Sequence, residues 1–395
     1  MTSATPQTRA WRLRVYPLVV LLTLGAALVF SATRYDVDNP ASRLGGDYPS
    51  FYSAGSIVGA GDWDELYDPV RQQAEQGGLI DDEGGYLYFS YPPFFAAVYG
   101  ALAGPAYQWS FVIHTVLMTL ALVGAIVALS PWLGRTGLPL SLLVVLGLAF
   151  QPVLTSVAGG QNTTLSLLLL AGAARLDHED RPVLAGLVAA LLVFKPQFGL
   201  VVVPLLVVSR RRRVLAGWGL GVLVLFAVSS LLVGGNWLGD WWSQASAFRE
   251  LNATANGANF VSLPGFMENL LGTGSGTALV VGYGLAAVVA AAVAWQWWVR
   301  PRADALWRWA LAGAAAMAVA PQTLFYDTGL LLLVLVAMVP TLSRPVLVVA
   351  GVAALSWLQL AKPTLGWSPL GPLALGAVAL VLWSQRGSRR PAVPT

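Results

Sequence analysis

The sequence predicts an all-α transmembrane bundle of about twelve membrane-spanning helices, which forms a single domain over residues 1–395. Two observations lead to this prediction. Of the 395 residues, 56% are hydrophobic and 11% are charged, whereas a soluble globular protein has about 25% charged residues. Apolar runs of about 17 residues or more recur along the chain, and each is long enough to cross a bilayer as a helix. The composition disfavours the alternative, a soluble helical protein with a large apolar core.

Arginine-rich connections set the expected orientation of these spans. They contain Arg9, Arg12 and Arg14; residues 210–213; Arg300, Arg302 and Arg308; and Arg386, Arg389 and Arg390. Basic residues flank spans on the cytoplasmic side, so we expect both termini inside the cell. The net charge of +4 comes from residues spaced by membrane spans, so it does not indicate nucleic-acid binding. The chain has no cysteine, which excludes disulfides and thiolate metal sites.

The first span is expected at about residues 15–33. It is longer than a signal-peptide core and Arg34 follows it without a small-residue cleavage site, so we interpret it as a retained span. Lys195-Pro196 interrupts a later run, and because proline breaks a helix this run is either one span or two half-spans. The direction in which each span between residues 91 and 195 crosses the membrane therefore stays open. The later spans are expected at about 91–104, 106–130, 138–156, 160–175, 182–209, 214–234, 276–299, 304–320, 328–341, 345–360 and 367–384.

Two hydrophilic stretches separate the spans. The first outer loop, residues 34–90, is expected to contain short amphipathic helices. The second outer loop, residues 235–275, is rich in Trp, Asn and Gly, and its tryptophans favour the membrane interface. Eleven of the nineteen acidic residues lie in the first loop: Asp36, Asp38, Asp47, Asp62, Asp64, Glu65, Asp68, Glu75, Asp81, Asp82 and Glu83. We therefore expect the first outer loop to carry the chemistry.

Asp47 is the candidate catalytic residue of this loop. It lies among aromatic residues about fourteen positions beyond the first span. A carboxylate held among aromatic rings can have a raised pKa and act as a general base. The alternative is a solvated aspartate, or an N-cap for a helix over residues 50–59. The later cluster from Asp62 to Asp68 could supply oxygen ligands to a cation, but it lacks the spacing of a calcium loop, so a solvated helix start is favoured.

Lys195 is one of two lysines in the chain, the other being Lys362. A cation in an apolar span is costly and usually faces a cavity, a partner or an anion. An ammonium group binds phosphate well, whereas the simpler interpretation is a lysine that extends to the interface.

His114 lies in the middle of a predicted span and is expected to be a hydrogen-bonded core histidine. Tyr91-Pro92-Pro93 begins the next span, because proline fits the first helical turn.

Polar residues near the predicted span ends supply further candidates. Gln161 and Asn162 begin an apolar run. The two amides could bind sugar hydroxyls. Alternatively, Asn162 or a following threonine could cap the helix. Arg249 and Glu250 lie in the second outer loop, where an exposed ion pair is the simpler interpretation. Asp327 lies at the outer mouth of a span, where a binding role and a helix cap are equally consistent with the pattern.

Together these segments resemble glycosyltransferase family 87, one of the GT-C membrane glycosyltransferases. The resemblance covers about residues 40–330. That family includes polyprenol-phosphate-mannose-dependent mannosyltransferases and arabinofuranosyltransferases. The matching motifs are Asp47-Tyr48 with residues 51–55, then residues 66–68, Tyr91-Pro92-Pro93, Gly160-Gln161-Asn162, Lys195-Pro196, residues 262–265, and Pro321-Gln322 with Tyr326-Asp327. The resemblance implies a GT-C-like fold and an enzyme that transfers a sugar, with mannose favoured over arabinofuranose or another lipid-linked sugar.

The resemblance also implies roles for individual residues. Asp47 matches the catalytic base, and Lys195 matches a lysine near the donor phosphate. Gln322 stands where many relatives have histidine, so a phosphate-neutralising charge is missing there, and Arg249 is a candidate to compensate for it. The implied substrate-binding residues are Tyr48, Tyr52, Tyr91, Gln161, Asn162, Tyr326 and Asp327. Displacement in one step, with Asp47 as base, would invert the anomeric centre.

The implied partners are a polyprenyl-phosphate-sugar donor, a glycan or glycolipid acceptor and the bilayer, without nucleic acid. The site is expected on the outer face of the cell membrane, where nucleotide sugars are absent, and the mechanism requires neither a metal nor a cofactor. A second hypothesis is a transporter or flippase of lipid-linked sugars, with Lys195 and Asp327 as gating charges. It accounts for charge inside the membrane but not for the acidic loop. A purely structural membrane protein accounts for neither.

Overall fold

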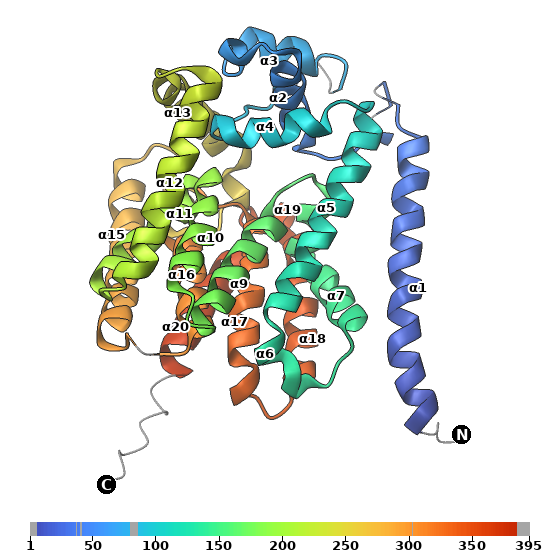
Figure 1. The fold of residues 1–395 in the computed structure, drawn as a ribbon, viewed down its shortest axis with the longest axis vertical. Helices are drawn as coiled ribbons and strands as arrows, with labels where there is room; N and C mark the ends of the chain where they lie inside the picture. Colours follow the sequence, from blue (N-terminus) through green and yellow to red (C-terminus); the bar gives the residue numbers. More distant parts are fainter. Residues whose placement is uncertain (1–5, 37, 40–41, 80–85, 302, 385–395) are drawn as a thin grey trace.

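The computed structural model describes residues 6–36, 38–39, 42–79, 86–301 and 303–384. These residues form helices joined by turns, and no strand occurs among them apart from an isolated bridge between Phe260 and Leu324. The all-α prediction is therefore confirmed (Figure 1). The helices are α1 (Pro6–Thr33), α2 (Tyr48–Ala60), α3 (Pro69–Gln76), α4 (Pro93–Leu102), α5 (Tyr107–Ala128), α6 (Ser130–Leu133), α7 (Leu140–Ala149), α8 (Gln151–Ala158), α9 (Thr163–His178), α10 (Pro182–Ala190), α11 (Pro196–Val208), α12 (Arg212–Val233), α13 (Trp237–Asn256), α14 (Leu263–Leu271), α15 (Gly276–Val299), α16 (Ala305–Val319), α17 (Leu331–Met338), α18 (Pro345–Ser356), α19 (Lys362–Leu365) and α20 (Leu370–Ser384).

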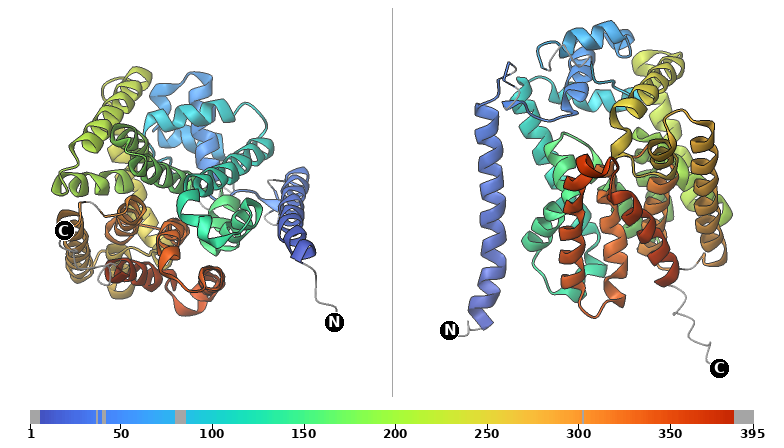
Figure 2. Two further views of the ribbon diagram at one scale, coloured as in Figure 1. Left: turned by 60° about the horizontal axis from the view of Figure 1, so that its bottom comes forward. Right: turned by 180° about the vertical axis from the view of Figure 1, so that it is seen from behind.

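The bundle has two distinct ends. Helices α2, α3, α4 and α13 gather at one of them, which we call the loop end (Figure 1). Helix α1 begins, and α20 ends, at the opposite end, which we call the basic end. Helix α1 stands at the edge of the bundle and contacts it mainly through α7 and α5 (Figure 2). The predicted residues Asp81, Asp82, Glu83, Arg302, Arg386, Arg389 and Arg390 lie outside the described residues.

Five segments are long and apolar enough to cross a membrane. They are Leu13–Thr33, Tyr107–Ala128, Arg212–Val233, Gly276–Val299 and Pro345–Leu365. A sixth arises if α7 and α8, which meet at an angle of 85°, are counted as one broken span. The expected number of about twelve spans is therefore not confirmed among the described residues. The other apolar segments are helices of 10–17 residues.

Prolines divide several of the predicted spans into shorter pieces. Phe150 is extended before Pro152, so the predicted span over residues 138–156 bends between α7 and α8. Lys195, with φ −110° and ψ 86°, is likewise non-helical before Pro196. The segment 182–209 is therefore divided into α10, the short 3₁₀ helix η5 (Leu191–Phe194) and α11, as half-spans would be. This break fixes the backbone around Lys195.

The first loop contains short helices, as predicted, and α4 closes it. Helices α2 and α3 lie within residues 34–90. Helix α4 begins at Pro93 as expected, but its ten residues rise about 15 Å, roughly half the thickness of the hydrocarbon core. It lies against α2 at the loop end (Figure 1). The predicted span over residues 91–104 is therefore not confirmed as a single crossing, because too few helical residues follow the prolines.

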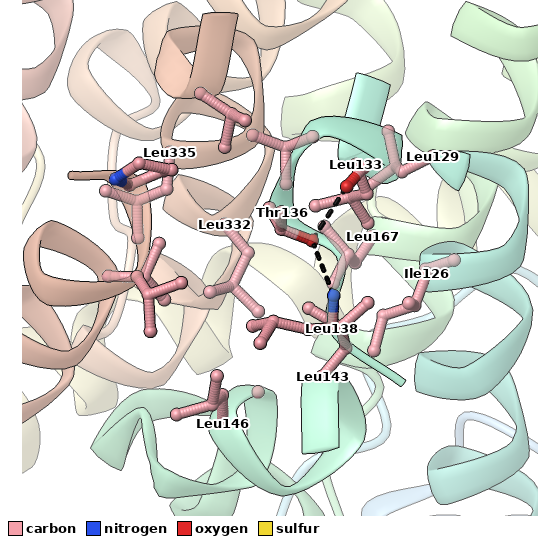
Figure 3. A pocket seen from close by; sticks show the side chains of 17 residues that line it. Ile126, Leu129, Leu133, Thr136, Leu138, Leu143, Leu146, Leu167, Leu332 and Leu335 are labelled. Atoms are coloured by element: carbon pink, nitrogen blue, oxygen red, sulfur yellow. Dashed lines mark hydrogen bonds between the residues drawn. The ribbon is translucent and has the colours of Figure 1, made fainter. Parts of the chain in front are cut away.

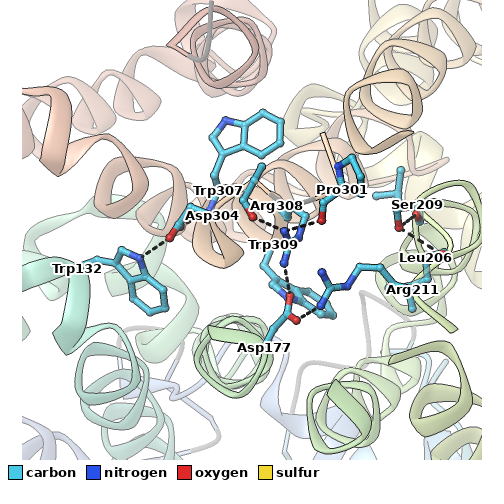
Figure 4. A network of polar contacts seen from close by, with 12 residues as sticks. Trp132, Asp177, Leu206, Ser209, Arg211, Pro301, Asp304, Trp307, Arg308 and Trp309 are labelled. Carbon is cyan, nitrogen blue, oxygen red and sulfur yellow. Dashed lines mark hydrogen bonds and ion pairs between the residues drawn. The ribbon is translucent and has the colours of Figure 1, made fainter. Parts of the chain in front are cut away.

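A network of charged and indole groups closes the basic end (Figure 4). Asp177, at the end of α9, accepts hydrogen bonds from Arg211, from Arg308 Nη2 at 2.8 Å and from Trp309 Nε1 at 3.2 Å. Asp304 accepts a bond from Trp132 Nε1 at 3.3 Å. The network therefore joins the ends of α6, α9 and α16 to the connection between α11 and α12.

Candidate active site

The site begins with Asp47, immediately before α2. Asp47 occupies the N-cap position of α2, in agreement with the N-cap alternative. However, its side chain accepts no capping hydrogen bond from the described residues. Its backbone N–H donates to Gly159 O at 3.0 Å, and its Oδ2 accepts a hydrogen bond from Gln161 Nε2. The carboxylate is therefore partly buried and free of the helix end, so the capping interpretation of its side chain is wrong.

Glycines allow the Asp47 segment and the Gly159–Gln161 loop to meet. Gly160 has φ +74°, and a Cβ there would collide with the backbone and Cβ of Tyr48. Gly45 has φ +63° and packs against the ring of Phe111. Such positive φ values favour glycine because it has no side chain. Tyr48 itself is fully buried, and its hydroxyl bonds to Ser110 Oγ at 2.6 Å, so it fixes the two segments from the core.

Gln161 and Asn162 are buried at the junction of these segments. Helix capping was one of the two alternatives for this pair. Asn162 occupies the N-cap position of α9, but its Oδ1 accepts a hydrogen bond from Tyr99 Oη at 2.8 Å and makes no capping bond to a described residue. Gln161 Oε1 and Asn162 Nδ2 are buried without a partner in the described part of the chain. His114 is fully buried with Nδ1 3.4 Å from Tyr99 Oη, which confirms it as a core histidine. The amide pair therefore retains unused hydrogen-bonding capacity.

Lys195 pairs with Asp327. Nζ of the lysine lies 2.7 Å from Oδ1 of the aspartate, and the two side chains are 4% and 6% exposed. Thr163 Oγ1 donates to the same Oδ1 at 3.2 Å, and the ring centroids of Phe198 and Tyr326 lie 5.6 and 5.7 Å from Nζ. Asp327 is thus the counter-ion of the lysine rather than a helix cap, and the lysine side chain is buried within the protein.

Asp47 lies within the electrostatic influence of this pair. Burial raises the pKa of Asp47 above its ordinary value, and Asp327 adds to the increase. The hydrogen bond from Gln161 and the charge of Lys195 act in the opposite direction. Burial also raises the pKa of Tyr91, and Asp327 and Asp47 raise it further, which keeps that phenol neutral. The four polar groups Asp47, Gln161, Lys195 and Asp327 form what we call the loop-end cluster.

Several predicted residues lie beside this cluster. Tyr91 packs with its ring centroid 5.0 Å from that of Phe51, and its carbonyl accepts a bond from Tyr67 Oη at 2.7 Å. Tyr326 faces Lys195, as described above. Tyr52 instead donates from Oη to Pro105 O at 3.2 Å and packs against Tyr107. Tyr52, like Tyr48, therefore has a structural contact for its hydroxyl.

Gln322 and Arg249 lie next to each other on the α13 side. Gln322 Nε2 donates to the backbone carbonyl of Arg249 at 2.9 Å, and its Oε1 accepts a bond from Asn252 Nδ2 at 3.0 Å. The Arg249 side chain is exposed, and no described contact brings its guanidinium to Lys195 or Asp47. The expected ion pair between Arg249 and Glu250 is absent from the described residues. Gln322 therefore links its own segment to α13.

The acidic cluster of the first loop is a structural network. Asp68 caps α3 and accepts bonds from Val70 N at 2.7 Å and Arg71 N at 3.2 Å, which confirms the predicted helix start. The Arg71 side chain pairs with Asp62 at 3.2 Å, with Glu65 at 3.0 Å and with Glu75 at 2.8 Å. No group of three or more potential metal ligands occurs in the residues that the structure describes. Arg71 therefore bridges these three carboxylates and offsets part of their charge.

Sequence reasoning missed three contributors to the site. Thr163 binds Asp327, Tyr99 binds Asn162 and Asn252 binds Gln322. Thr163 follows directly after the predicted amide pair, so its position was a usable signal. Tyr99 and Asn252 lie 63 and 70 residues from their partners and carry no local pattern.

An apolar pocket lies away from this cluster, towards the basic end. Residues of α5, α7, α9, α17 and α18 line it, with Thr136 as its polar member (Figure 3). Thr136 Oγ1 donates to Leu133 O at 2.7 Å, so its hydroxyl is already bonded. None of the predicted site residues lines the pocket among those described. It is therefore not the candidate active site.

Comparison with known proteins identifies one family. The model of glycosyltransferase family 87 matches residues 89–321, well over half of the chain. The match includes Tyr91, Gln161, Asn162, Lys195 and Arg249, whereas the segments that carry Asp47 and Asp327 lie on either side of it. No curated protein and no solved structure gives a significant match.

Proposed function

The chain belongs to glycosyltransferase family 87, and we propose that it transfers a sugar from a polyprenyl-phosphate donor to an acceptor hydroxyl at the loop end. Mannose is the sugar we favour, with arabinofuranose or another lipid-linked sugar as the alternative. The observation that carries the proposal is the loop-end cluster: a carboxylate released from helix capping and held by a buried amide, beside a buried ammonium group.

Asp47 is the proposed general base. Its carboxylate accepts one side-chain bond, from a neutral amide, whereas Asp327 is fully paired with Lys195. Oδ1 of Asp327 already accepts hydrogen bonds from Lys195 and Thr163, so this carboxylate is engaged before a substrate binds. Burial raises the pKa of Asp47, which brings it closer to the operating pH, as efficient general-base catalysis requires. Asp47 is therefore better suited than Asp327 to accept a proton.

Lys195 is the proposed partner of the leaving phosphate. The acceptor hydroxyl gives its proton to Asp47 while its oxygen bonds to the anomeric carbon. The bond from that carbon to the phosphate oxygen breaks, and polyprenyl phosphate leaves with the electron pair. The leaving group gains one negative charge as the carboxylate loses one, and the Lys195 ammonium stabilises the new charge. Attack opposite the leaving group inverts the anomeric centre.

The proposed orientation places the loop end at the outer face and the basic end in the cytoplasm, with both termini inside. Arg211 and Arg308 lie together in the basic-end network, and basic residues favour the cytoplasmic side. Nucleotide sugars remain in the cytoplasm, so a lipid-linked sugar is the appropriate donor for an outer site. The proposed acceptor is a glycan or glycolipid. The residues of the site require no metal for this step.

Turnover by purified protein tests the proposal. The wild type is expected to transfer sugar from at least one member of a panel of polyprenyl-phosphate sugars. Asp47→Asn keeps the shape of the side chain but removes its basicity, so we expect kcat to fall by about 10²- to 10⁴-fold, the usual contribution of a general base. Donor binding should persist. Asp64→Asn is the matched control, because Asp64 is an exposed aspartate of the same loop.

The same variant separates the proposal from a transporter or flippase, for which the buried Lys195–Asp327 pair would act as a gating charge. A transporter with Asp47→Asn should move lipid-linked sugars across vesicle membranes at nearly the wild-type rate. If the wild type turns over none of the donors under conditions in which a related enzyme works, the transferase proposal is wrong.

A further inference from the structure

Gln161 has two polar atoms, and the described structure uses one of them. Its Nε2 donates to Asp47 Oδ2. Its Oε1 is buried without a partner among the described residues, in a side chain that is 5% exposed. A buried acceptor without a donor is unfavourable and uncommon in folded proteins. Gln161 differs from other buried amides in that its Nε2 is bonded to the proposed base, so a substrate hydroxyl bound at Asp47 would lie near this free acceptor.

The orientation of this amide follows from its neighbours. Rotation by 180° about the final side-chain bond would place Oε1 against the carboxylate of Asp47, and two acceptors would then face each other. The backbone is also fixed, because Gln161 N–H donates to Ser156 O at 2.7 Å and Asp47 N–H to Gly159 O at 3.0 Å. The Asp47 carboxylate and the free Oε1 therefore keep a constant relative position.

We propose that Gln161 is a positioning residue that holds the Asp47 carboxylate with Nε2 and accepts, at Oε1, a hydrogen bond from a second hydroxyl of the acceptor. This inference depends on the proposed function, since it assumes that Asp47 takes a proton from the acceptor. The two atoms of one carboxamide share a carbon, so hydroxyls bound to Asp47 and to Oε1 lie side by side. Neighbouring ring carbons of a sugar present hydroxyls in this way.

The acceptor class follows from this geometry. It is a sugar or polyol in which the attacking hydroxyl has a hydroxyl on the adjacent carbon. An isolated hydroxyl on a hydrocarbon chain would satisfy Asp47 but leave Oε1 unpaired. Sites that hydrogen-bond a substrate hydroxyl discriminate strongly against the analogue that lacks it.

The first test is the pH dependence of transfer. Gln161→Met keeps the length of the side chain but removes the donor to Asp47. The bond from Gln161 lowers the pKa of that carboxyl, so its loss should raise the pKa. The acid limb of kcat/KM should then move to higher pH. Gln151→Met is the matched control, because Gln151 is also buried but bonds to Thr155 rather than to Asp47. The acid limb of kcat/KM in this control should stay at the wild-type pH.

The second test uses a defined acceptor, octyl α-D-mannopyranoside, with its monodeoxy analogues and 1-octanol. Removal of the hydroxyl next to the attacking one should lower wild-type kcat/KM by about ten-fold or more, and by less than about two-fold in Gln161→Met. 1-Octanol should be a poor acceptor for the wild type.

The outcomes separate this inference from the function on which it depends. Suppose that the wild type is active and Asp47→Asn is inactive. If Gln161→Met then shows no shift of the acid limb, and loses as much kcat/KM as the wild type when the neighbouring hydroxyl is removed, the inference is wrong and the proposed function stands. A wild type that transfers from no donor overturns both.

Discussion

Asp47 and Asp327 are both aspartates near Lys195, but their carboxylates have different hydrogen-bond partners. Asp327 is 2.7 Å from the ammonium and also accepts a bond from Thr163, whereas Asp47 is bonded by an amide. When Asp47, Asp327 and Lys195 are all ionised, the two carboxylates outnumber the one ammonium group, so the cluster is negatively charged. A phosphodiester donor brings a further negative charge. The Asp327 charge raises the pKa of Asp47, and under the proposed function it would also oppose binding of the donor.

Asp327→Asn tests this role. The amide can still accept a bond from Lys195 while the negative charge is removed, so the KM for the donor should fall several-fold. The pKa of Asp47 should also fall because Asp327 raises it. Since a base must be ionised to act, the acid limb of kcat/KM should move to lower pH, opposite to the shift expected for Gln161→Met. The measurement is a pH series of initial transfer rates at several donor concentrations.

Asp64→Asn, which removes a charge from the exposed part of the same loop, serves as the control and should leave both quantities unchanged. A higher KM for the donor in Asp327→Asn, together with an unmoved acid limb, would show that the Asp327 charge does not act on the reacting groups.

At the residue scale, the sequence predicts candidates better than their partners. Asp47 stood out within an aromatic segment and Lys195 as a rare cation in an apolar run. The ion pair between Lys195 and Asp327 joins residues 132 positions apart, so no local spacing could reveal it. The bond from Gln161 to Asp47 spans 114 positions. Such contacts depend on how the helices pack, which a single sequence does not specify.

At the element scale, glycines determine how closely α10 and α12 approach. A Cβ on Gly217 would collide with the backbone of Val183, and one on Gly186 would collide with the backbone of Val214. Small residues at such crossings let helix backbones pack closely inside membranes, where apolar burial provides little net drive. Because α10 leads directly into the Lys195 break, this crossing supports the site.

Gly217→Ala should destabilise the protein, because the added methyl group meets a backbone that cannot move alone. The expected cost is about 1–3 kcal/mol, typical of overpacking. Gly219→Ala is the matched control on the same helix, where no described atom lies within 4 Å of the added Cβ. It should be neutral or stabilising by up to about 1 kcal/mol, since alanine favours a helix more than glycine does. Thermal unfolding in detergent measures both, and equal Tm values would contradict the close crossing.

The elements themselves were only partly predictable. The long apolar runs predicted α5, α12 and α15 close to their observed bounds, whereas α1 ends as expected at Thr33 but begins earlier, at Pro6. The expected number of spans was not confirmed, because hydropathy detects apolar runs but not the bends within them. The 85° angle between α7 and α8 and the short α4 depend on prolines and on packing at the loop end. Composition cannot distinguish a crossing helix from one that ends within the bundle.

On the scale of the whole molecule, the two ends have different tasks. The loop end holds the proposed chemistry, with the Asp47 carboxylate bonded by Gln161 and Lys195 paired with Asp327. The basic end holds Asp177, which is 2% exposed and bonded by two arginines and an indole. Its contacts join segments 34 to 132 positions apart (Figure 4). We therefore infer that the basic end maintains the arrangement of helices within which the loop-end cluster forms.

Asp177→Asn tests this division. Loss of the carboxylate leaves Arg211 and the buried Arg308 side by side without their counter-ion, and removal of one partner from a buried ion pair costs about 3–5 kcal/mol. Tm should fall by several degrees, while kcat at low temperature should remain close to the wild-type value because Asp47 is at the other end. Glu179→Gln is the control on the same stretch of chain. Its pair with Arg175 is partly exposed, and exposed ion pairs contribute little to stability, so Tm should stay close to the wild-type value. An Asp177→Asn protein with wild-type Tm but lost turnover would show instead that the basic end acts directly on the reaction.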